Sequence, residues 1–254
     1  MAQGRTGAGL TLDTLRQGTT DPRAVETHYD GWADSYDATL AQWRYRTPEE
    51  VAALMVAHLP PAGTTPGGVL RVLDVGCGTG LFGQALAAEM QADRRGGDRD
   101  AAAGEGPDRD GPEGEGADWR GVVLDGLDIS AASLERAAER GVYDRLLRQD
   151  LQALPLPLPD DGHDGAAIVG VLTYIPDAEA LLRDLCRVVR TGGVIAFTQR
   201  SDLWEPRGFP ALIARLEAEG TWRRLHISPP RPYLPENADF ADEIGVIQTL
   251  CRVG

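Results

Sequence analysis

The residues with the clearest chemical potential lie where a short apolar run meets a cluster of glycines. Residues 69–83 read VLRVLDVGCGTGLFG, with Asp74 ahead of glycines at positions 76, 78, 80 and 83. This order predicts a buried strand that turns tightly into a helix. Glycines let backbone N–H groups approach a ligand, and the helix directs its dipole at the same place. The match to G-x-G-x-x-G leaves a dinucleotide and other adenosine-containing ligands as alternatives.

Acidic residues stand at the ends of two further predicted strands. Asp128 follows the run GVVLDGL at 121–127, and Asp150 lies near the end of the run 146–151. Doubly wound folds bind ligands at the carboxyl ends of their strands, so we expect these acids to lie beside the glycine turn. Asp128 is placed to accept both ribose hydroxyls of an adenosine-type ligand. Its separation from the turn becomes the usual one once the insertion at 92–118 is set aside.

The elements that must position these residues alternate along the chain. Near-continuously apolar strands separated by helices predict an α/β fold with a doubly wound, mostly parallel sheet of seven strands. The last two strands are expected to pair antiparallel. Strands are predicted at 69–75, 121–127, 146–151, 166–172, 194–200, 222–228 and 245–253, and helices at 21–36, 49–58, 81–90, 131–140, 176–189 and 206–219.

Composition predicts one domain with additions. The 254 residues are 42% hydrophobic, which is enough for a sizeable core. Residues 1–20 are expected to be a flexible lead-in, and 21–254 a single domain that opens with a helical cap at 21–60. Residues 92–118 have no large apolar side chain, and we interpret them as a disordered, acidic, Gly-rich insertion.

Net charge and cysteine content limit the kinds of binding partner that we expect. A formal net charge of −14 argues against nucleic acid, because such binding depends on clustered basic residues. Three separated cysteines fit reduced thiols and give no metal motif. The start of the chain has no apolar leader, and no run approaches the length of a membrane span, so we expect a soluble cytoplasmic protein with no membrane partner. The oligomeric state stays open.

The predicted first helix carries an aromatic stripe. Tyr29, Trp32, Ala33 and Tyr36 follow the spacing i, i+3, i+4, i+7 and therefore share one face. Spacing alone favours an ordinary core face for this stripe. A lid over a ligand is the alternative.

Five motifs in order resemble the class I S-adenosylmethionine-dependent methyltransferases. They are LDVGCGTG at 73–80, LDIS at 127–130, QDL at 149–151, HDGAAIVGVL at 163–172 and VRTGGVIAF at 189–197. More narrowly, YDGWADSYD at 29–37 and RYRTPEEVA at 44–52 are similar to the methyltransferase-like group related to the Williams-Beuren syndrome chromosome region 27 protein. The resemblance implies a Rossmann-like fold and the cofactor S-adenosylmethionine, with S-adenosylhomocysteine as product.

The resemblance also implies roles around the methionine part of the cofactor. Asp74 would orient the turn and reach the ligand through water. Tyr36 and Arg46 would cap the site, with Arg46 pairing with the methionine carboxylate. Three glycines would pass beneath the methionine moiety: Gly76, Gly78 and Gly80.

A second set of residues would hold the nucleoside. By the same resemblance, Asp128 binds the ribose and Ile129 packs on the adenine. Asp150 accepts from the adenine amino group, while the Leu151 backbone meets the ring edge. Gly170 brings the end of the fourth strand close to the sulfonium.

The reaction so implied is in-line transfer of a methyl group to a small-molecule acceptor. The activated group resides in the cofactor, so alignment and exclusion of water suffice, and neither a metal nor a catalytic triad is required. His28, Tyr174 and His226 are candidate bases, but none is specified by its neighbours. The alternatives are an NAD-dependent oxidoreductase and a non-catalytic S-adenosylmethionine-binding module.

Residues 201–240 are expected to form the acceptor side. Four aromatic residues and several arginines in this stretch suggest an acidic or aromatic acceptor, although the same aromatics could instead pack the final helix onto the sheet. Whether oxygen, nitrogen or carbon is methylated is left open. The four aromatics are Trp204, Phe209, Trp222 and Tyr233.

Overall fold

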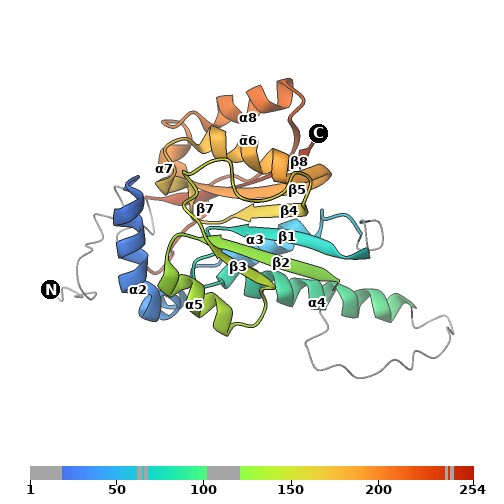
Figure 1. The fold of residues 1–254 in the computed structure, drawn as a ribbon, viewed down its shortest axis with the longest axis horizontal. Coiled ribbons are helices and arrows are strands. Elements are labelled where there is room, and N and C mark those ends of the chain that lie inside the picture. Colours follow the sequence, from blue (N-terminus) through green and yellow to red (C-terminus); the bar gives the residue numbers. More distant parts are fainter. Residues whose placement is uncertain (1–18, 62–64, 66–67, 102–120, 238–239, 241–242) are drawn as a thin grey trace.

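A single twisted sheet forms the centre of the molecule (Figure 1). The computed structural model describes residues 19–61, 65, 68–101, 121–237, 240 and 243–254. Strand order is β3-β2-β1-β4-β5-β8-β6, and the short β7 pairs with β8. The strands are β1 (Leu70–Val75), β2 (Val122–Asp128), β3 (Arg145–Arg148), β4 (His163–Ile168), β5 (Val189–Arg200), β6 (Trp222–Ile227), β7 (Arg231–Pro232) and β8 (Gly245–Val253).

The sheet is parallel up to β5 and antiparallel beyond it. Strands β3, β2, β1, β4 and β5 pair in parallel, whereas β8 runs antiparallel to both β5 and β6. The predicted doubly wound, mostly parallel sheet of seven principal strands is confirmed, as is the antiparallel pairing at its end. The reversal of strand order next to β1 brings the ends of β1 and β4 together, where such folds bind ligands.

Helices cover both faces of the sheet, and α2 stands beside one end of its strands (Figure 1). The helices are α2 (Pro22–Gln42), α3 (Thr47–Val56), α4 (Leu81–Ala101), α5 (Ala131–Glu139), α6 (Ala178–Val188), α7 (Ser201–Trp204) and α8 (Phe209–Ala218), with a 3-10 turn, η3 (Leu172–Tyr174). Helices α4, α5 and α6 each connect two parallel strands, whereas α3 precedes β1.

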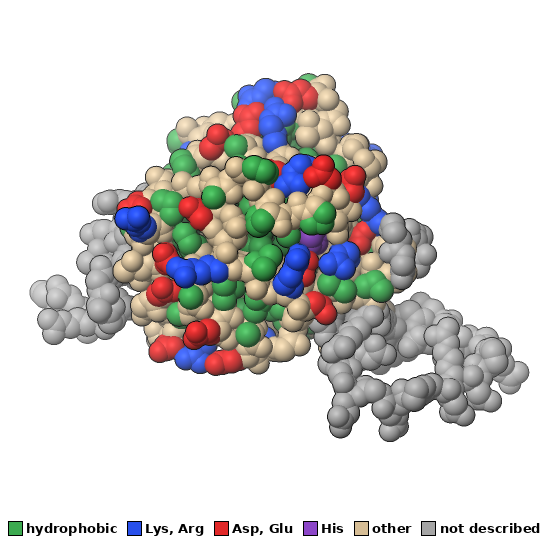
Figure 2. Space-filling model, viewed as in Figure 1, with side chains coloured by type: hydrophobic (Ala, Val, Ile, Leu, Met, Phe, Trp, Pro, Cys, Tyr) green, Lys and Arg blue, Asp and Glu red, His purple; other side chains and the backbone are tan. Residues whose placement is uncertain are grey.

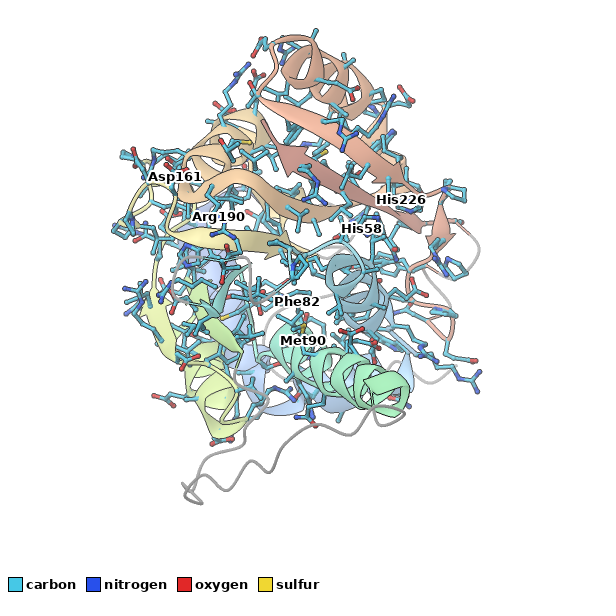
Figure 3. The ribbon with its side chains drawn as sticks, turned by 90° about the vertical axis from the view of Figure 1, so that its right-hand side faces the viewer. His58, Phe82, Met90, Asp161, Arg190 and His226 are labelled. Carbon is cyan, nitrogen blue, oxygen red and sulfur yellow. The ribbon has the colours of Figure 1, made fainter. Side chains whose placement is uncertain are left out.

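Two apolar cores separate the helices from the sheet. One core packs α6 and α8 against the sheet and includes Phe197 and Trp222. The other packs α3 and α4 against the opposite face and includes Met55. Phe82 and Met90 point from α4 into this second core (Figure 3). Burial on both faces explains why the strands are near-continuously apolar.

Side-chain caps open helices α2 and α5. The Asp21 carboxylate accepts from the Arg23 N–H at 3.1 Å, with Pro22 as the first helical residue. The Ser130 hydroxyl accepts from the Ser133 N–H at 3.0 Å and caps α5. At α3 the helix begins at Thr47 itself, preceded by Arg46, which makes no capping bond through its side chain.

Helix α4 is longer than the sequence predicted. It runs from Leu81 to Ala101 rather than ending near Met90, so the first residues of the expected 92–118 insertion are helical. Ala, Gln and Arg in this stretch favour helix, and the first proline comes only at Pro107. Residues 1–18 of the expected lead-in and 102–118 of the insertion lie outside the described residues.

The surface in view carries arginine and acidic side chains interspersed rather than in single-sign fields (Figure 2). Within the described ranges, no helix combines the length and apolar character that a bilayer crossing requires.

Candidate active site

The glycine turn after β1 is held against the end of β2 by backbone bonds. The N–H groups of Gly76 and Cys77 donate to the carbonyl of Leu127 at 2.7 and 2.9 Å. Gly76 has φ of +72°, and a β-carbon there would collide with the Val171 side chain. Only glycine combines this backbone conformation with so close a neighbour. The turn is therefore locked in place between β2 and the segment after β4.

Asp128 fastens the turn from the end of β2. Its Oδ2 accepts from the Gly78 N–H at 2.8 Å, and its Oδ1 accepts from the Ser130 N–H at 2.8 Å. Burial raises the pKa of this carboxyl, while the hydrogen bonds from Ser130 and Gly78 oppose the rise. Each oxygen retains acceptor capacity beyond these bonds, which suits a hydroxyl-bearing ligand.

A first cavity of about 610 Å³, including its open mouth, lies over the turn. Eight of the eleven residues predicted to bind the cofactor line it, drawn from α2 and from the ends of β1, β2, β3 and β4. They are Tyr36, Gly76, Gly78, Asp128, Ile129, Asp150, Leu151 and Gly170. A β-carbon at Gly78 would meet nothing within 4 Å, so the chain leaves open space at this point of the wall.

Asp74 does not line the first cavity. It is buried at the end of β1, where its Oδ2 accepts from the Tyr143 hydroxyl at 2.6 Å. Burial raises the pKa of Asp74 to about 7, opposed by the bond from Tyr143. Tyr143 in turn packs so close to Gly83 that a β-carbon there would collide with its hydroxyl. The predicted orienting role fits this bracing contact, whereas reach to a ligand through water has no support from the cavity lining.

Two other predicted residues also lie outside the lining. Gly80 is buried at the start of α4, next to the side chains of Arg140 and Tyr143. Arg46 is exposed immediately before α3 and lines neither cavity. The cap expected from Arg46 stays a prediction, and Arg46 directly follows Tyr45, which lines the second cavity.

A second cavity of about 480 Å³, again including its mouth, adjoins the first. Both cavities share Tyr29, Tyr36, Gly170 and Tyr174 as lining residues. Aromatic rings make up most of the wall, and Arg200 supplies its one charged side chain among the described residues. The remaining lining residues are Trp32, Leu40, Trp43, Tyr45, Thr173, Tyr233, Leu234 and Phe240.

The aromatic stripe of α2 serves both as lid and as core. Tyr29 packs edge-on against Tyr174 with ring centroids 5.8 Å apart, and Trp32 does so against Tyr36 at 4.7 Å. Ala33 is buried on the same helix. Spacing had favoured an ordinary core face, but three of the four stripe residues face cavities.

Only part of the expected acceptor side lines the second cavity. Tyr233 lines it, together with Leu234 and Phe240. Trp204, Phe209 and Trp222 instead belong to the core beneath α8, where the rings of Trp204 and Phe209 stack at 5.4 Å. The alternative interpretation, that these aromatics pack the helix onto the sheet, is correct for all three.

The candidate bases are separated by the fold. Tyr174 lines both cavities, whereas His28 and His226 line neither. His226 lies on β6, the edge strand of the sheet. Figure 3 shows this residue from the side of the molecule opposite α2. Burial lowers the pKa of His28, which packs against the rings of Tyr29 and Trp32.

Arg200 is the main functional residue that the sequence reasoning missed. It lies at the end of β5 with 5% of its surface exposed and forms a double contact with Asp202 at 3.0 and 2.6 Å. Its guanidinium also lies 5.8 Å from the centre of the Phe240 ring. The available signal was its place at a strand end, which the sequence interpretation used only for the acids.

A polar face of α2 fixes the helix beside α5. Asp30 accepts from the Ser130 hydroxyl at 2.6 Å, and Asp34 pairs with Arg136 at 2.5 Å. Asp37 pairs with Arg140 and accepts from the Thr79 hydroxyl at 2.5 Å. The helix thus presents rings to the cavities and carboxylates to α5.

Comparison with known proteins agrees with this architecture. A family model described as "Methyltransferase domain" matches residues 116–197. Magnesium protoporphyrin IX methyltransferase from Synechocystis PCC 6803, solved with bound S-adenosylmethionine, superposes with a TM-score of 0.55 at 17% identity, covering 98% of this chain and 100% of that one. The fold is therefore that of Rossmann-like methyltransferases.

Sequence relatives narrow the class. Human methyltransferase-like protein 27 is 30% identical over 200 residues, which cover 78% of this chain and 67% of the human protein. The 27-O-demethylrifamycin SV methyltransferase of Amycolatopsis mediterranei is 26% identical over 199 residues, covering 77% of this chain and 59% of that protein. The chain belongs to the class I S-adenosylmethionine-dependent methyltransferases related to human methyltransferase-like protein 27, and its cofactor is S-adenosylmethionine.

Proposed function

We propose that the chain transfers the methyl group of S-adenosylmethionine to a small molecule held in the second cavity. One observation carries this proposal: the two cavities share Gly170, Tyr29, Tyr36 and Tyr174 as a common wall. A ligand in each would meet at this wall. In-line transfer requires that contact between the donor and acceptor atoms.

Assignment of the first cavity to the cofactor rests on the chemistry of its lining. Gly78 leaves open space for the methionine portion beside Gly76, and Asp128 offers acceptor oxygens to the ribose hydroxyls. Ile129 would pack on the adenine, while Asp150 and the Leu151 backbone would meet its polar edge. When bound, the cofactor supplies a methyl carbon activated by a positively charged sulfur.

The protein's part in the reaction is to align and to exclude water. Tyr29 and Tyr36 of α2 cover both cavities at their junction. The ring of Tyr174, edge-on to Tyr29, closes the same wall from the segment after β4. These rings would shield the reacting atoms from solvent and fix the approach of the acceptor.

Calorimetric titration with S-adenosylhomocysteine tests the cofactor site. We expect saturable binding at one site per chain, and NADH should compete weakly or not at all. Preferential binding of NADH would overturn the proposal. Turnover is then tested with a library of small metabolites, with formation of S-adenosylhomocysteine and methylated product measured together.

A non-catalytic binding module is the remaining alternative. It predicts tight binding of S-adenosylhomocysteine without turnover for any acceptor. The second cavity argues against it, because a module that bound only the cofactor would have no use for a second, aromatic cavity that adjoins the first at Gly170. Methyl transfer to even one acceptor in the library would exclude this alternative.

A further inference from the structure

The second cavity combines hydrogen-bond donors with a positive charge. Five tyrosine side chains line it, and their hydroxyls stay protonated at neutral pH because burial raises the pKa of each one. Arg200 is the lining residue that carries a charge. Among the described residues of this wall, none is a carboxylate or a histidine that could take up a proton near neutral pH.

The field of Arg200 reaches the acceptor space despite its pairing with Asp202. Burial dominates the raised pKa of Tyr174 and Tyr233, but the Arg200 charge opposes that rise at both hydroxyls. At Tyr233 the effect of Arg200 outweighs the opposite effect of Asp202. The Arg200 side chain is 6% exposed and lines the cavity, whereas that of Asp202 is 35% exposed and does not line it.

We propose that the acceptor is an aromatic molecule whose methyl-accepting oxygen is already ionised when it binds, as in an aromatic carboxylate or an acidic phenol. This rests on the proposed methyl transfer. A wall lined by aromatic rings suits an aromatic acceptor, because packed rings gain more stability than the burial of their surface alone provides. Arg200 and the tyrosine hydroxyls suit a negative oxygen. A protonated amine would meet the same donors and the same positive charge.

Such an acceptor also makes a base unnecessary. A lone pair of the ionised oxygen forms the bond to the methyl carbon while the carbon–sulfur bond breaks and its electron pair remains on sulfur. The negative charge of the oxygen and the positive charge of the sulfur disappear together. No proton is transferred, which agrees with a cavity wall that offers donors and no proton acceptor.

Four probes that share a benzene ring test the acceptor chemistry: benzoate, 4-nitrophenol, phenol and benzylamine. With S-adenosylhomocysteine bound, quenching of Trp32 and Trp43 fluorescence reports occupancy of the second cavity. With S-adenosylmethionine, product mass reports methylation and separates the carboxylate source from the phenol source. We expect benzoate or 4-nitrophenol to bind at least tenfold more tightly than benzylamine, and methylation of phenol to rise with pH as phenol ionises. Equal or better binding of benzylamine, or no binding of either anion, would overturn the proposal.

Two variants of the Arg200–Asp202 pair are expected to change binding in opposite directions. This separates an effect of charge from damage to the fold. Arg200→Gln should weaken binding of the anionic probes roughly tenfold, and Asp202→Asn should strengthen it, because it removes the negative charge of a carboxylate that pairs with Arg200 and repels an anionic ligand. Structural damage would weaken binding in both variants, so a loss in Asp202→Asn contradicts the proposal. Titration of each variant with S-adenosylhomocysteine tests the proposed cofactor site separately. That site is contradicted if S-adenosylhomocysteine does not bind.

Discussion

The two adjoining cavities are lined by chemically different groups. The first takes backbone and carboxylates from the strand ends, with Asp128 and Asp150 in its wall. The second takes aromatic rings from α2 and from loops, with Arg200 as its charged residue. Under the proposed function, the acids of the first cavity hold the nucleoside of the methyl donor, and the arginine of the second cavity meets the negative oxygen of the acceptor. Gly170 stands at the boundary.

The largest expected effect comes from Asp128→Ala. The variant removes the acceptors proposed for the ribose and the bond that holds the Gly78 N–H. Hydrogen bonds to a charged group contribute about 1.5–3 kcal/mol each, so calorimetry should show S-adenosylhomocysteine affinity falling by roughly 100-fold or more. Tyr233→Phe, which alters only the second cavity, is the matched control and should leave that affinity within about threefold. Equal losses in both variants would contradict the division between the cavities.

The contrast between the cavities also explains which site residues could be predicted from the sequence. The first cavity follows from strand ends, and parallel strands bring their ends together whatever the loops do. Gly76, Asp128 and Asp150 were therefore assignable from local pattern alone. The fold class followed from the same alternation of apolar strands and helices.

The second cavity depends on how distant segments pack. Tyr233 faces the cavity while Trp222 faces the core, yet both are aromatic residues in the same loosely patterned stretch. Nothing in their spacing separates the two roles, because tertiary packing decides them. The role of Arg46 likewise came from motif context, and the residue lies immediately before α3, outside the lining of both cavities. The extent of α4 was missed because charged residues can be helical as well as disordered.

Asp74 gives a pH-dependent test of the support behind the first cavity. Its folded pKa of about 7 lies above the ordinary value of 3.8, so the protonated carboxyl stabilises the folded state. That contribution is full below the ordinary pKa and is lost as the pH rises through the folded pKa. Between about pH 5 and pH 8, wild type should lose about 2–3 kcal/mol more stability than Asp74→Asn. Denaturant titrations at both pH values measure the free energy of unfolding, and an equal loss in wild type and Asp74→Asn would show that burial does not raise the pKa of Asp74 into this range.

A pair of glycine variants isolates the close approach that locks the turn. Gly76→Ala carries both a positive φ and a collision with Val171, whereas Gly141→Ala carries a positive φ of +65° with no neighbour within 4 Å. We expect a cost of about 1 kcal/mol at Gly141 and about 2–3 kcal/mol at Gly76, from urea unfolding midpoints. If the two variants lose equal stability, the contact between the turn and the segment after β4 is unimportant.

The smallest expected effect concerns the helix that covers both cavities. Pro22, Val25, Tyr29 and Tyr36 of α2 line the first cavity, so we expect movement of this helix to widen the exit for bound cofactor product. On its other face, carboxylates including Asp34 hold it to α5 through exposed contacts that salt screens.

Arg136→Gln, which removes the partner of Asp34, should therefore speed dissociation of S-adenosylhomocysteine by no more than about threefold at low salt and by less at high salt. The matched control is Arg183→Gln, because Arg183 pairs with Glu179 and Glu219 away from α2. Stopped-flow fluorescence measures both rates. A salt-independent increase, or the same increase in Arg183→Gln, would show that the ionic face of α2 does not hold the lid closed. The aromatic face would then be what retains it, since ring packing is insensitive to added salt.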